Sequence, residues 1–264
     1  MAKLIDQVVK DRVMRVTLVV LVTVCMYLQY GNAENLNVTA PTLSYENGDR
    51  YVGEVLRDLP NGQGSYYYAD GDCYEGEFRD GLIQGQGTYY YADGSRYEGE
   101  FWNGDRNGQG VYYFANGEQY EGEFRDNKFH GQGTISFADG SRYEGGFQDG
   151  KFYGQGTLHL ADGGRCEGQF QYGVLHGQGI FYHGDGNRYE GEFRNGRRDG
   201  HGTLHFTNGE QYEGEFRDGL PNGHGTYHNA DGSRYEGSWS MACPTGGWLF
   251  SPDGAKKWVE TWWY

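Results

Sequence analysis

Residues 97–117 read Tyr97-Glu98-Gly99-Glu100-Phe101, then a polar segment to Gly108-Gln109-Gly110, then Val111-Tyr112-Tyr113-Phe114-Ala115-Asn116-Gly117, and this stretch determines the fold. Asn-Gly or Asp-Gly beside short ring-rich runs is a strong hairpin signal, because both central residues of a type I′ turn need positive φ. The stretch therefore predicts two antiparallel strands. The Asn-Gly turn leads to the next strand, and the polar segment makes the return connection.

The stretch is one copy of a unit that recurs every 23 residues. Nine copies begin at equivalent positions, which are Tyr51, Tyr74, Tyr97, Tyr120, Tyr143, Cys166, Tyr189, Tyr212 and Tyr235, and a degenerate tenth copy begins at Trp258. A lone hairpin is marginal in water, so each copy should be stabilised by stacking on its neighbours. We therefore expect an all-β fold, an elongated antiparallel β-hairpin solenoid or gutter over residues 45–257, preceded by an N-terminal hydrophobic signal helix.

These residues resemble the membrane occupation and recognition nexus (MORN) repeat. The signature of that family is Tyr-Glu-Gly-Glu-aromatic, a Gly-x-Gly pair, and Asp-Gly before the next Tyr, and most copies between residues 45 and 260 meet it. Departures include Gly146 in the fifth copy, Cys166 in the sixth and Ser238 in the last. The resemblance implies a repeat scaffold, and self-association is common among proteins of this kind. MORN repeats also accompany lipid kinase and methyltransferase domains, but this chain has no residues left to form one.

Alternation along a strand assigns side chains to two faces, so Tyr and Phe of each first strand share a face with Gly. Nothing in the sequence beyond the N-terminal segment predicts a helix that could cover these rings. Only the curl of the sheet, the polar loops or a partner remain to do so. We take the first-strand rings as a candidate binding gutter: Tyr74, Phe78, Tyr97, Phe101, Tyr120, Phe124, Tyr143, Phe147, Tyr189, Phe193, Tyr212 and Phe216. The alternative is that these rings only pack on one another.

The opposite face carries a second stripe of rings in the second strand of each copy. It consists of Tyr67, Tyr90, Tyr113, His159, Tyr182, His205 and His228. We regard this stripe as the second candidate for a binding surface.

Composition and charge limit the classes of function. Of 264 residues, 47 are Gly and 17% are aromatic, so the core must be built mainly from rings. The formal net charge of −15 argues against binding to nucleic acid or to an anionic membrane surface, since both need Lys and Arg to neutralise phosphate. A positively charged protein partner fits this charge.

The polar residues do not form an exceptional catalytic constellation, so we expect no enzyme. Glutamates such as Glu98 and Glu121 recur at equivalent positions, and no pair is set apart as acid and nucleophile. His201 and His205 lie four residues apart, which on a strand is about 13 Å and too far for a shared metal ion. The Gly-x-Gly pairs precede no helix that could hold a phosphate. We expect neither a cofactor nor a metal.

The N-terminal segment predicts entry into the secretory pathway. Residues 1–33 combine basic residues, an apolar run from Val16 to Leu28 and small residues before a cut after Ala33, as in a signal peptide. The mature chain would then be secreted, with residues 34–44 as a flexible linker and Asn37 as an N-glycosylation site. If the signal stays uncleaved, residues 16–30 would anchor the chain in a membrane, and this is the only membrane contact that we expect.

The C-terminal residues 258–264 form a Trp-rich cap in this interpretation. Trp258, Trp262 and Trp263 would cover the last strand or form the surface of a homodimer.

The leading hypothesis is a non-catalytic repeat scaffold of the secretory pathway that binds a protein partner, or itself, along an aromatic gutter. One alternative is a secreted carbohydrate-binding protein that stacks sugars on rings flanked by carboxylates. The other is a repeat protein that tethers a membrane or lipid.

Overall fold

A computed structural model describes residues 41–260. In this range the chain forms one antiparallel sheet of 20 strands, and each strand pairs with the next one along the chain. The described residues contain no helix. The strands are β1 Thr42–Ser44, β2 Arg50–Leu56, β3 Leu59–Tyr67, β4 Cys73–Arg79, β5 Leu82–Tyr90, β6 Arg96–Trp102, β7 Asp105–Tyr113, β8 Gln119–Arg125, β9 Lys128–Ser136, β10 Arg142–Gln148, β11 Lys151–His159, β12 Arg165–Gln171, β13 Val174–Tyr182, β14 Arg188–Arg194, β15 Arg197–His205, β16 Gln211–Arg217, β17 Leu220–His228, β18 Arg234–Ser240, β19 Cys243–Phe250 and β20 Lys256–Val259.

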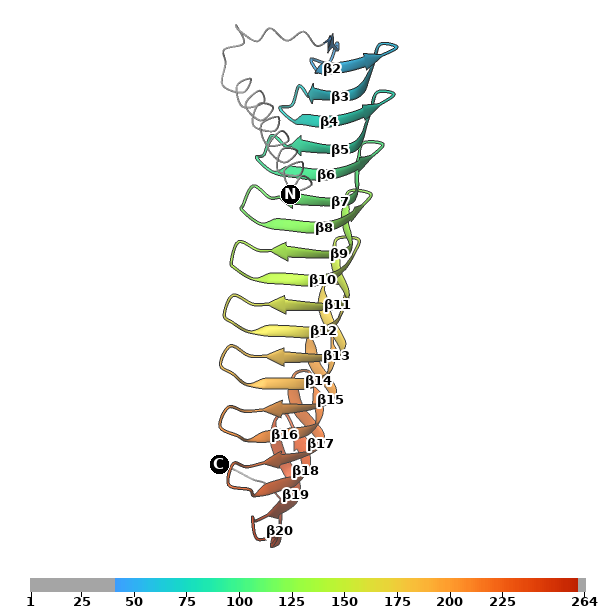
Figure 1. The fold of residues 1–264 in the computed structure, drawn as a ribbon. Helices are drawn as coiled ribbons and strands as arrows, with labels where there is room; N and C mark the ends of the chain where they lie inside the picture. Colours follow the sequence, from blue (N-terminus) through green and yellow to red (C-terminus); the bar gives the residue numbers. More distant parts are fainter. Residues whose placement is uncertain (1–40, 261–264) are drawn as a thin grey trace, which may run out of the picture.

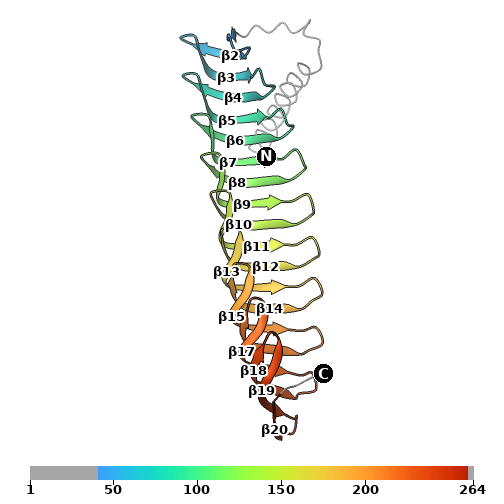
Figure 2. The same cartoon turned by 180° about the vertical axis from the view of Figure 1, so that it is seen from behind.

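The strands stack in chain order into an elongated column, and each long strand bends so that one part lies behind the other (Figure 1, Figure 2). The expected all-β hairpin repeat is therefore confirmed. The N-terminal helix, the signal segment 1–33 and Asn37 lie outside the described residues. Residues 42–44, which we expected to belong to the linker, form β1 and pair with β2.

The two ends of each hairpin use different turns. Asp80 and Gly81, between β4 and β5, have φ values of +49° and +83°, which is typical of a type I′ turn. The link from β5 to β6 is longer. There Gly94 N–H donates to Tyr91 O at 2.9 Å, and Gly94 has a φ of +89°, as in a type I turn followed by a glycine bulge. The type I′ turn that we expected at the Asp-Gly links is thus found at the return connection instead.

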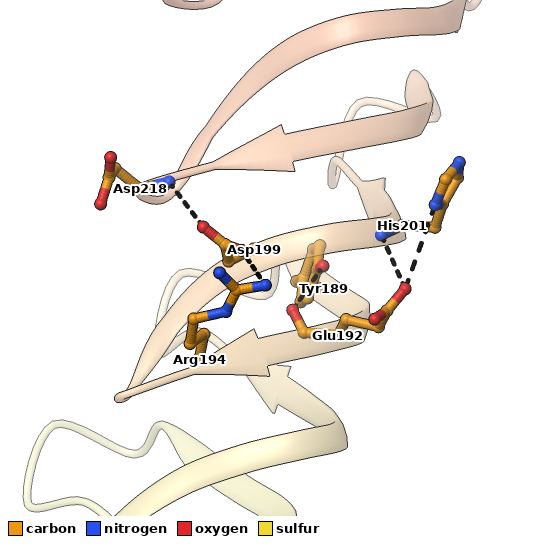
Figure 3. A network of polar contacts seen from close by, with 6 residues as sticks. All are labelled: Tyr189, Glu192, Arg194, Asp199, His201 and Asp218. Atoms are coloured by element: carbon orange, nitrogen blue, oxygen red, sulfur yellow. Dashed lines mark hydrogen bonds and ion pairs between the residues drawn. The ribbon is translucent and has the colours of Figure 1, made fainter.

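A bulge bends each hairpin that a return connection closes, and Figure 3 shows the polar contacts beside the one between β14 and β15. The pairing shifts between Gly191 and Phe193, so that Glu192 lies opposite several residues of β15. The Glu192 carboxylate accepts a hydrogen bond from the backbone N–H of His201 at 3.0 Å, and Gly200 adopts a φ of +107°. Bulges increase the bend and twist of a strand. We call the face enclosed by this bend the inner face and the opposite one the outer face.

The bend encloses a column of rings along the inner face. Tyr97 makes edge contacts with Phe101 of its own repeat, at 5.0 Å between ring centroids, and with Phe124 of the next repeat, at 4.8 Å. Its hydroxyl donates to Glu100 O at 3.0 Å. A Cβ on Gly110 would lie 2.5 Å from the Tyr97 ring, so the glycine makes the slot in which the ring lies. The same arrangement recurs along the chain and forms the core.

The first-strand rings are therefore not accessible, and our expectation of an open gutter is wrong at these positions. The tyrosines of the column are at most 1% exposed and the phenylalanines at most 7%. This applies to Tyr74, Phe78, Tyr97, Phe101, Tyr120, Phe124, Tyr143, Phe147, Tyr189, Phe193, Tyr212 and Phe216. The physical reason is the curl of the sheet, which lets the rings pack on one another, as the alternative interpretation had it.

One tyrosine position of the column is substituted, and the structure accommodates the change. Cys166 replaces the sixth tyrosine and is partly buried, and the Leu175 side chain, 5% exposed, fills the space. A Cβ on Gly168 or Gly179 would meet Leu175 instead of a ring. Leu175 thus keeps the core continuous.

The last repeat is one residue shorter than the 23-residue period predicts. β19 has eight residues where β17 has nine, and its pairing sets Lys257 opposite Leu249 and Trp258 opposite Trp248. A one-residue shift moves a side chain to the other face of a sheet. Trp258 therefore lies on the outer face, 52% exposed and 5.4 Å from Trp248, and does not begin a tenth copy of the column. Trp262 and Trp263 lie outside the described residues.

Candidate functional site: the aromatic inner face

A second set of inner-face rings lies beside the buried column and remains partly exposed. The rings come from the ends of the second strands and from the links that follow, and each lies 4.5–5.8 Å from the next between centroids. We call this set the ring track: Tyr45, Tyr66, Tyr68, Tyr89, Tyr91, Tyr112 and Phe114. Alternation along the second strands places Tyr89 and Tyr112 on the same face as the first-strand rings, opposite which they pair, but we did not expect them to form the binding surface.

The links between repeats form an acidic rim along the same edge of the sheet. Each of the links at 68–72, 91–95, 114–118, 137–141, 160–164, 183–187, 206–210 and 229–233 contains at least one Asp or Glu and neither Lys nor Arg. Equivalent links are about 10 Å apart, because two strands separate them. The rim therefore presents regularly spaced negative charge beside the ring track.

Hydrogen bonds join the ring track to the rim. The Tyr66 hydroxyl donates to Asp49 Oδ2 and the Tyr89 hydroxyl donates to Asp72 Oδ2, both at 2.9 Å. The Ala69 N–H donates to Asp49 as well, and this bond, with smaller contributions from the Asn47 and Tyr66 side chains, lowers the pKa of that carboxyl. Burial, strengthened by these carboxylates, raises the pKa of Tyr66 and of Tyr89 above the usual range. Near neutral pH the surface thus combines neutral rings with ionised carboxylates.

The inner face already holds cationic side chains of this chain in two repeats. The Arg106 guanidinium carbon lies 5.0 Å from the centroid of Tyr112 and 5.7 Å from that of Phe124. Arg198 is placed in the same way, 5.6 Å from Tyr189 and 5.7 Å from Phe216. Such distances are within the range of cation–π attraction. The inner face is therefore chemically suited to guanidinium groups.

The second stripe lies on the outer face, as alternation predicts, and arginines of this chain cover part of it. Arg96 lies over the Tyr113 ring and Arg165 over the Tyr182 ring, each at 4.1 Å, and Arg50 lies over Tyr67 at 4.8 Å. Arg188 contacts His205 Nε2 at 3.1 Å. The remaining members, Tyr90, His159 and His228, lie in the same row. The second stripe and the ring track therefore lie on opposite faces of the sheet.

Some recurrent glutamates have a structural role that sequence reasoning missed. The second Glu of most first strands accepts a hydrogen bond from the backbone nine residues later, as Glu192 does from His201 and Glu215 does from His224. Figure 3 shows this bond together with the Arg194–Asp199 ion pair of 3.2 Å. The spacing between this Glu and the Gly-x-Gly pair is the same in most repeats, and this constancy could have indicated the hydrogen bond. These carboxylates hold the bend and are not free acids.

Between residues 41 and 260 no group of three or more His, Cys, Asp or Glu is arranged to hold a metal ion. Over the same residues, no helix has the length and hydropathy of a membrane span.

Comparison with known proteins identifies a family. The family model described as the MORN repeat matches eight consecutive segments: 51–73, 74–96, 97–119, 120–142, 143–165, 166–188, 189–211 and 212–234. A search of curated proteins finds no match. Among solved structures, the TCP10 domain of CPAP from Danio rerio is 16% identical with a TM-score of 0.39, covering 82% of this chain and 97% of that one. The G-box domain of CPAP is 15% identical with a TM-score of 0.30, covering 83% of this chain and 97% of that one.

These two solved structures are too dissimilar to this chain to support a functional argument. The segments matched by the family model, in contrast, coincide with the repeats seen in the structure. Each matched segment begins at the first-strand position of the column, from Tyr51 to Tyr212, and the structure adds a ninth repeat that begins at Tyr235. With 51–234 matched without a gap, the chain belongs to the MORN repeat family.

Proposed function

We propose that this chain is a non-catalytic scaffold of the secretory pathway whose inner face binds an extended, basic segment of another protein. The observation that carries the proposal is the ring track, which is partly exposed and lies directly beside an acidic rim without Lys or Arg. Tyrosine rings provide contact area at low entropic cost and are enriched at protein interfaces. Many weak, equivalent contacts along the repeats would add up to a stable complex.

The charge of the rim favours a basic partner over a second copy of this chain. Two inner faces brought together would place two acidic rims side by side, and like charges across an interface disfavour association. A partner with Arg or Lys at intervals would neutralise the rim instead. Arg106 supports this choice, because its guanidinium carbon lies 5.0 Å from the centroid of Tyr112, a ring of the track.

The arginines of the outer face leave little room for a carbohydrate on that face. Sugars stack on the free faces of rings, but the outer-face rings of Tyr67, Tyr113 and Tyr182 are covered by arginines. A lipid surface is disfavoured by the net charge of −15.

A pull-down with matched variants tests the binding surface. The double variant Tyr68→Ser, Tyr91→Ser removes two track rings, and the double variant Tyr90→Ser, Tyr113→Ser removes two outer-face rings at neighbouring positions. We expect the first to reduce the recovery of basic partner proteins about tenfold or more, because each central ring contributes about 1–2 kcal/mol. The measurement is quantitative mass spectrometry of proteins retained by each bait, repeated with the purified partner.

The outer-face variant serves as the control and should retain the partner like the unmodified chain. Circular dichroism and melting curves verify that both variants are folded. Equal retention by the track variant, or a loss confined to the outer-face variant, would contradict the proposal.

The secretory part of the proposal rests on the sequence of residues 1–33 and has its own test. When the full chain is expressed in secretion-competent cells, we expect it in the medium, with Glu34 as the first residue after cleavage behind Ala33. N-terminal sequencing of the recovered protein measures this. Recovery from the cytosol with an intact Met1 would overturn the location while leaving the binding surface untouched.

A further inference from the structure

The ring track presents the same group of rings once in every repeat. Tyr45, Tyr68 and Tyr91 occupy equivalent positions one repeat apart, and each is partly exposed. Tyr68 lies 4.6 Å from Tyr66 between ring centroids, and Tyr91 lies 4.5 Å from Tyr89. The track therefore has a period of one repeat, and a ligand that follows it must have a matching period.

Arg106 marks one end of the uncovered part of the track. Its guanidinium carbon lies 5.0 Å from the centroid of the Tyr112 ring. Among the residues that the structure describes, no arginine or lysine lies over Tyr45, Tyr68 or Tyr91. These three rings are therefore the ones that a ligand can contact without displacing a cation of this chain.

The backbone beside these rings is already hydrogen-bonded within the links. Tyr68 N–H donates to Asp72 O at 3.0 Å, and Gly71 N–H donates to Tyr68 O at 3.1 Å. The next link repeats both bonds at Tyr91. A ligand on the track therefore finds no open row of backbone donors with which it could pair as an added β-strand. Its own backbone must keep its hydrogen bonds to water.

A polyproline II helix meets this condition, because its backbone is fully solvated and has no internal hydrogen bonds. Its period also fits the track. Equivalent positions of neighbouring repeats are two strand spacings apart, about 9.4–9.8 Å. One turn of polyproline II is three residues with a rise of about 3.1 Å each, or about 9.3 Å. A β-strand turns the same side to a surface about every 6.6 Å and an α-helix about every 5.4 Å, so neither would present one face to successive repeats.

The acidic rim has the same period as the rings. Asp70 and Asp93 lie at equivalent positions of successive links, and both side chains are exposed. Hydrogen bonds from the Ser95 side chain and backbone lower the pKa of Asp93, so this carboxylate is ionised at neutral pH. A cationic residue at every third position of the ligand would meet one carboxylate per turn.

We propose that the ring track binds a polyproline II segment of the partner in which proline and arginine each recur at every third residue. One turn of this segment lies on each repeat. Its prolines contact Tyr45, Tyr68 and Tyr91, and its arginines pair with Asp70 and Asp93. A preformed polyproline II helix loses little conformational entropy on docking to aromatic rings. The inference rests on the proposed function in one respect: it takes the ring track as the surface that binds the partner.

Synthetic peptides test the period without the natural partner. The probe is a fluorescein-labelled peptide of three Pro-Ala-Arg units, and its binding to the full chain is measured by fluorescence anisotropy. A shuffled peptide has the same residues and charge, but no two of its prolines are separated by a multiple of three positions. We expect the period-three peptide to bind saturably. The shuffled peptide should bind at least about tenfold more weakly, because only one of its prolines can face the rings at a time.

Two substitutions in identical local sequences provide a matched test of the rim. Asp93 and Asp231 both lie in an Ala-Asp-Gly-Ser link, and each accepts hydrogen bonds from the backbone and side chain of the serine two residues later. Asp93→Lys places a positive charge beside Tyr91 and should weaken binding of the period-three peptide at least about fivefold. Asp231→Lys makes the same change six repeats away, about 58 Å along the sheet, and should leave the Kd within about twofold.

Equal binding of the two peptides, no saturable binding of the period-three peptide, or equal effects of Asp93→Lys and Asp231→Lys would overturn the inference. These outcomes are separate from the fate of the proposed function. If the Tyr68→Ser, Tyr91→Ser bait loses its partner while the two peptides bind equally, the track binds a basic segment of another conformation. If the period-three peptide binds selectively and that bait keeps its partner, the proposed function is wrong and the polyproline II site stands alone.

Discussion

Tyr120→Ala is expected to lower the free energy of unfolding by about 3–5 kcal/mol, the range for removing a buried ring. Tyr120 is fully buried, stacks on Phe129 at 3.8 Å, and makes edge contacts with Phe124 and Phe147 at 5.1 and 5.0 Å. Its hydroxyl donates to Glu123 O at 2.9 Å across the bulge. The substitution therefore leaves a hole in the column and releases the bend in the middle of the sheet.

Urea denaturation followed by circular dichroism measures this effect. In a repeat protein each unit contacts only its neighbours, so the variant should also unfold less cooperatively, with the two halves separating. Tyr120→Phe is the matched control: it keeps the ring and removes only the hydroxyl, at an expected cost of about 0.5–1.5 kcal/mol. A cost below about 1 kcal/mol for Tyr120→Ala would show that the column does not hold the repeats together.

A second large effect is expected on raising the pH. Burial raises the pKa of Tyr51, Tyr143 and Tyr189 to about 12, whereas an unfolded tyrosine titrates near 10. Because the folded pKa values are the higher ones, the folded state holds these protons more tightly. The stabilisation is fully present below about pH 10 and is lost as the pH rises through about 12.

The expected result is a cooperative unfolding transition between about pH 10 and 12. Tyrosinate absorbance and the far-UV circular dichroism of the sheet, recorded on the same samples, measure it. The absorbance of the column tyrosines should rise together with the loss of the sheet signal. If all the tyrosines ionise while the sheet signal is intact, the column is open to solvent and its burial is refuted.

The repeat period and the assignment of faces could be read from the sequence. The 23-residue spacing from Tyr51 to Tyr235 has no insertion, and strand alternation separates Tyr89 from Tyr90 without further information. Both follow from local geometry, which is why they agree with the strand pairing in the structure.

The depth of the bend could not be predicted from the sequence. For this reason the burial of the first-strand rings could not be predicted either. Alternation tells which face a ring lies on, but not how far the sheet closes over that face. Here closure depends on the bulge at positions such as Glu192 and on the positive φ of Gly200, and it makes Tyr189 inaccessible. The same curl leaves Tyr68 and Tyr91, nearer the edge, partly exposed. The surface that we propose for binding therefore lies one row away from the rings with the strongest sequence signal.

The face of Trp258 was missed for a different reason. Counting in steps of 23 residues assumes that the ninth repeat has the standard length, whereas β19 is one residue shorter than β17. Aligning Cys243–Phe250 with Leu220–His228 residue by residue would have detected the deletion. Because side chains alternate, a single missing residue was enough to move this indole to the outer face.

Hydroxyl-radical footprinting of the tyrosines, with and without the partner retained by the unmodified bait, most directly tests which face binds. Tyr68 and Tyr91 should become several-fold less reactive in the complex. Tyr90, the neighbour of Tyr91 in the chain, and Tyr113, its equivalent in the next repeat, lie on the outer face and should keep their reactivity. Protection of Tyr90 and Tyr113 with unchanged Tyr68 and Tyr91 would contradict the account.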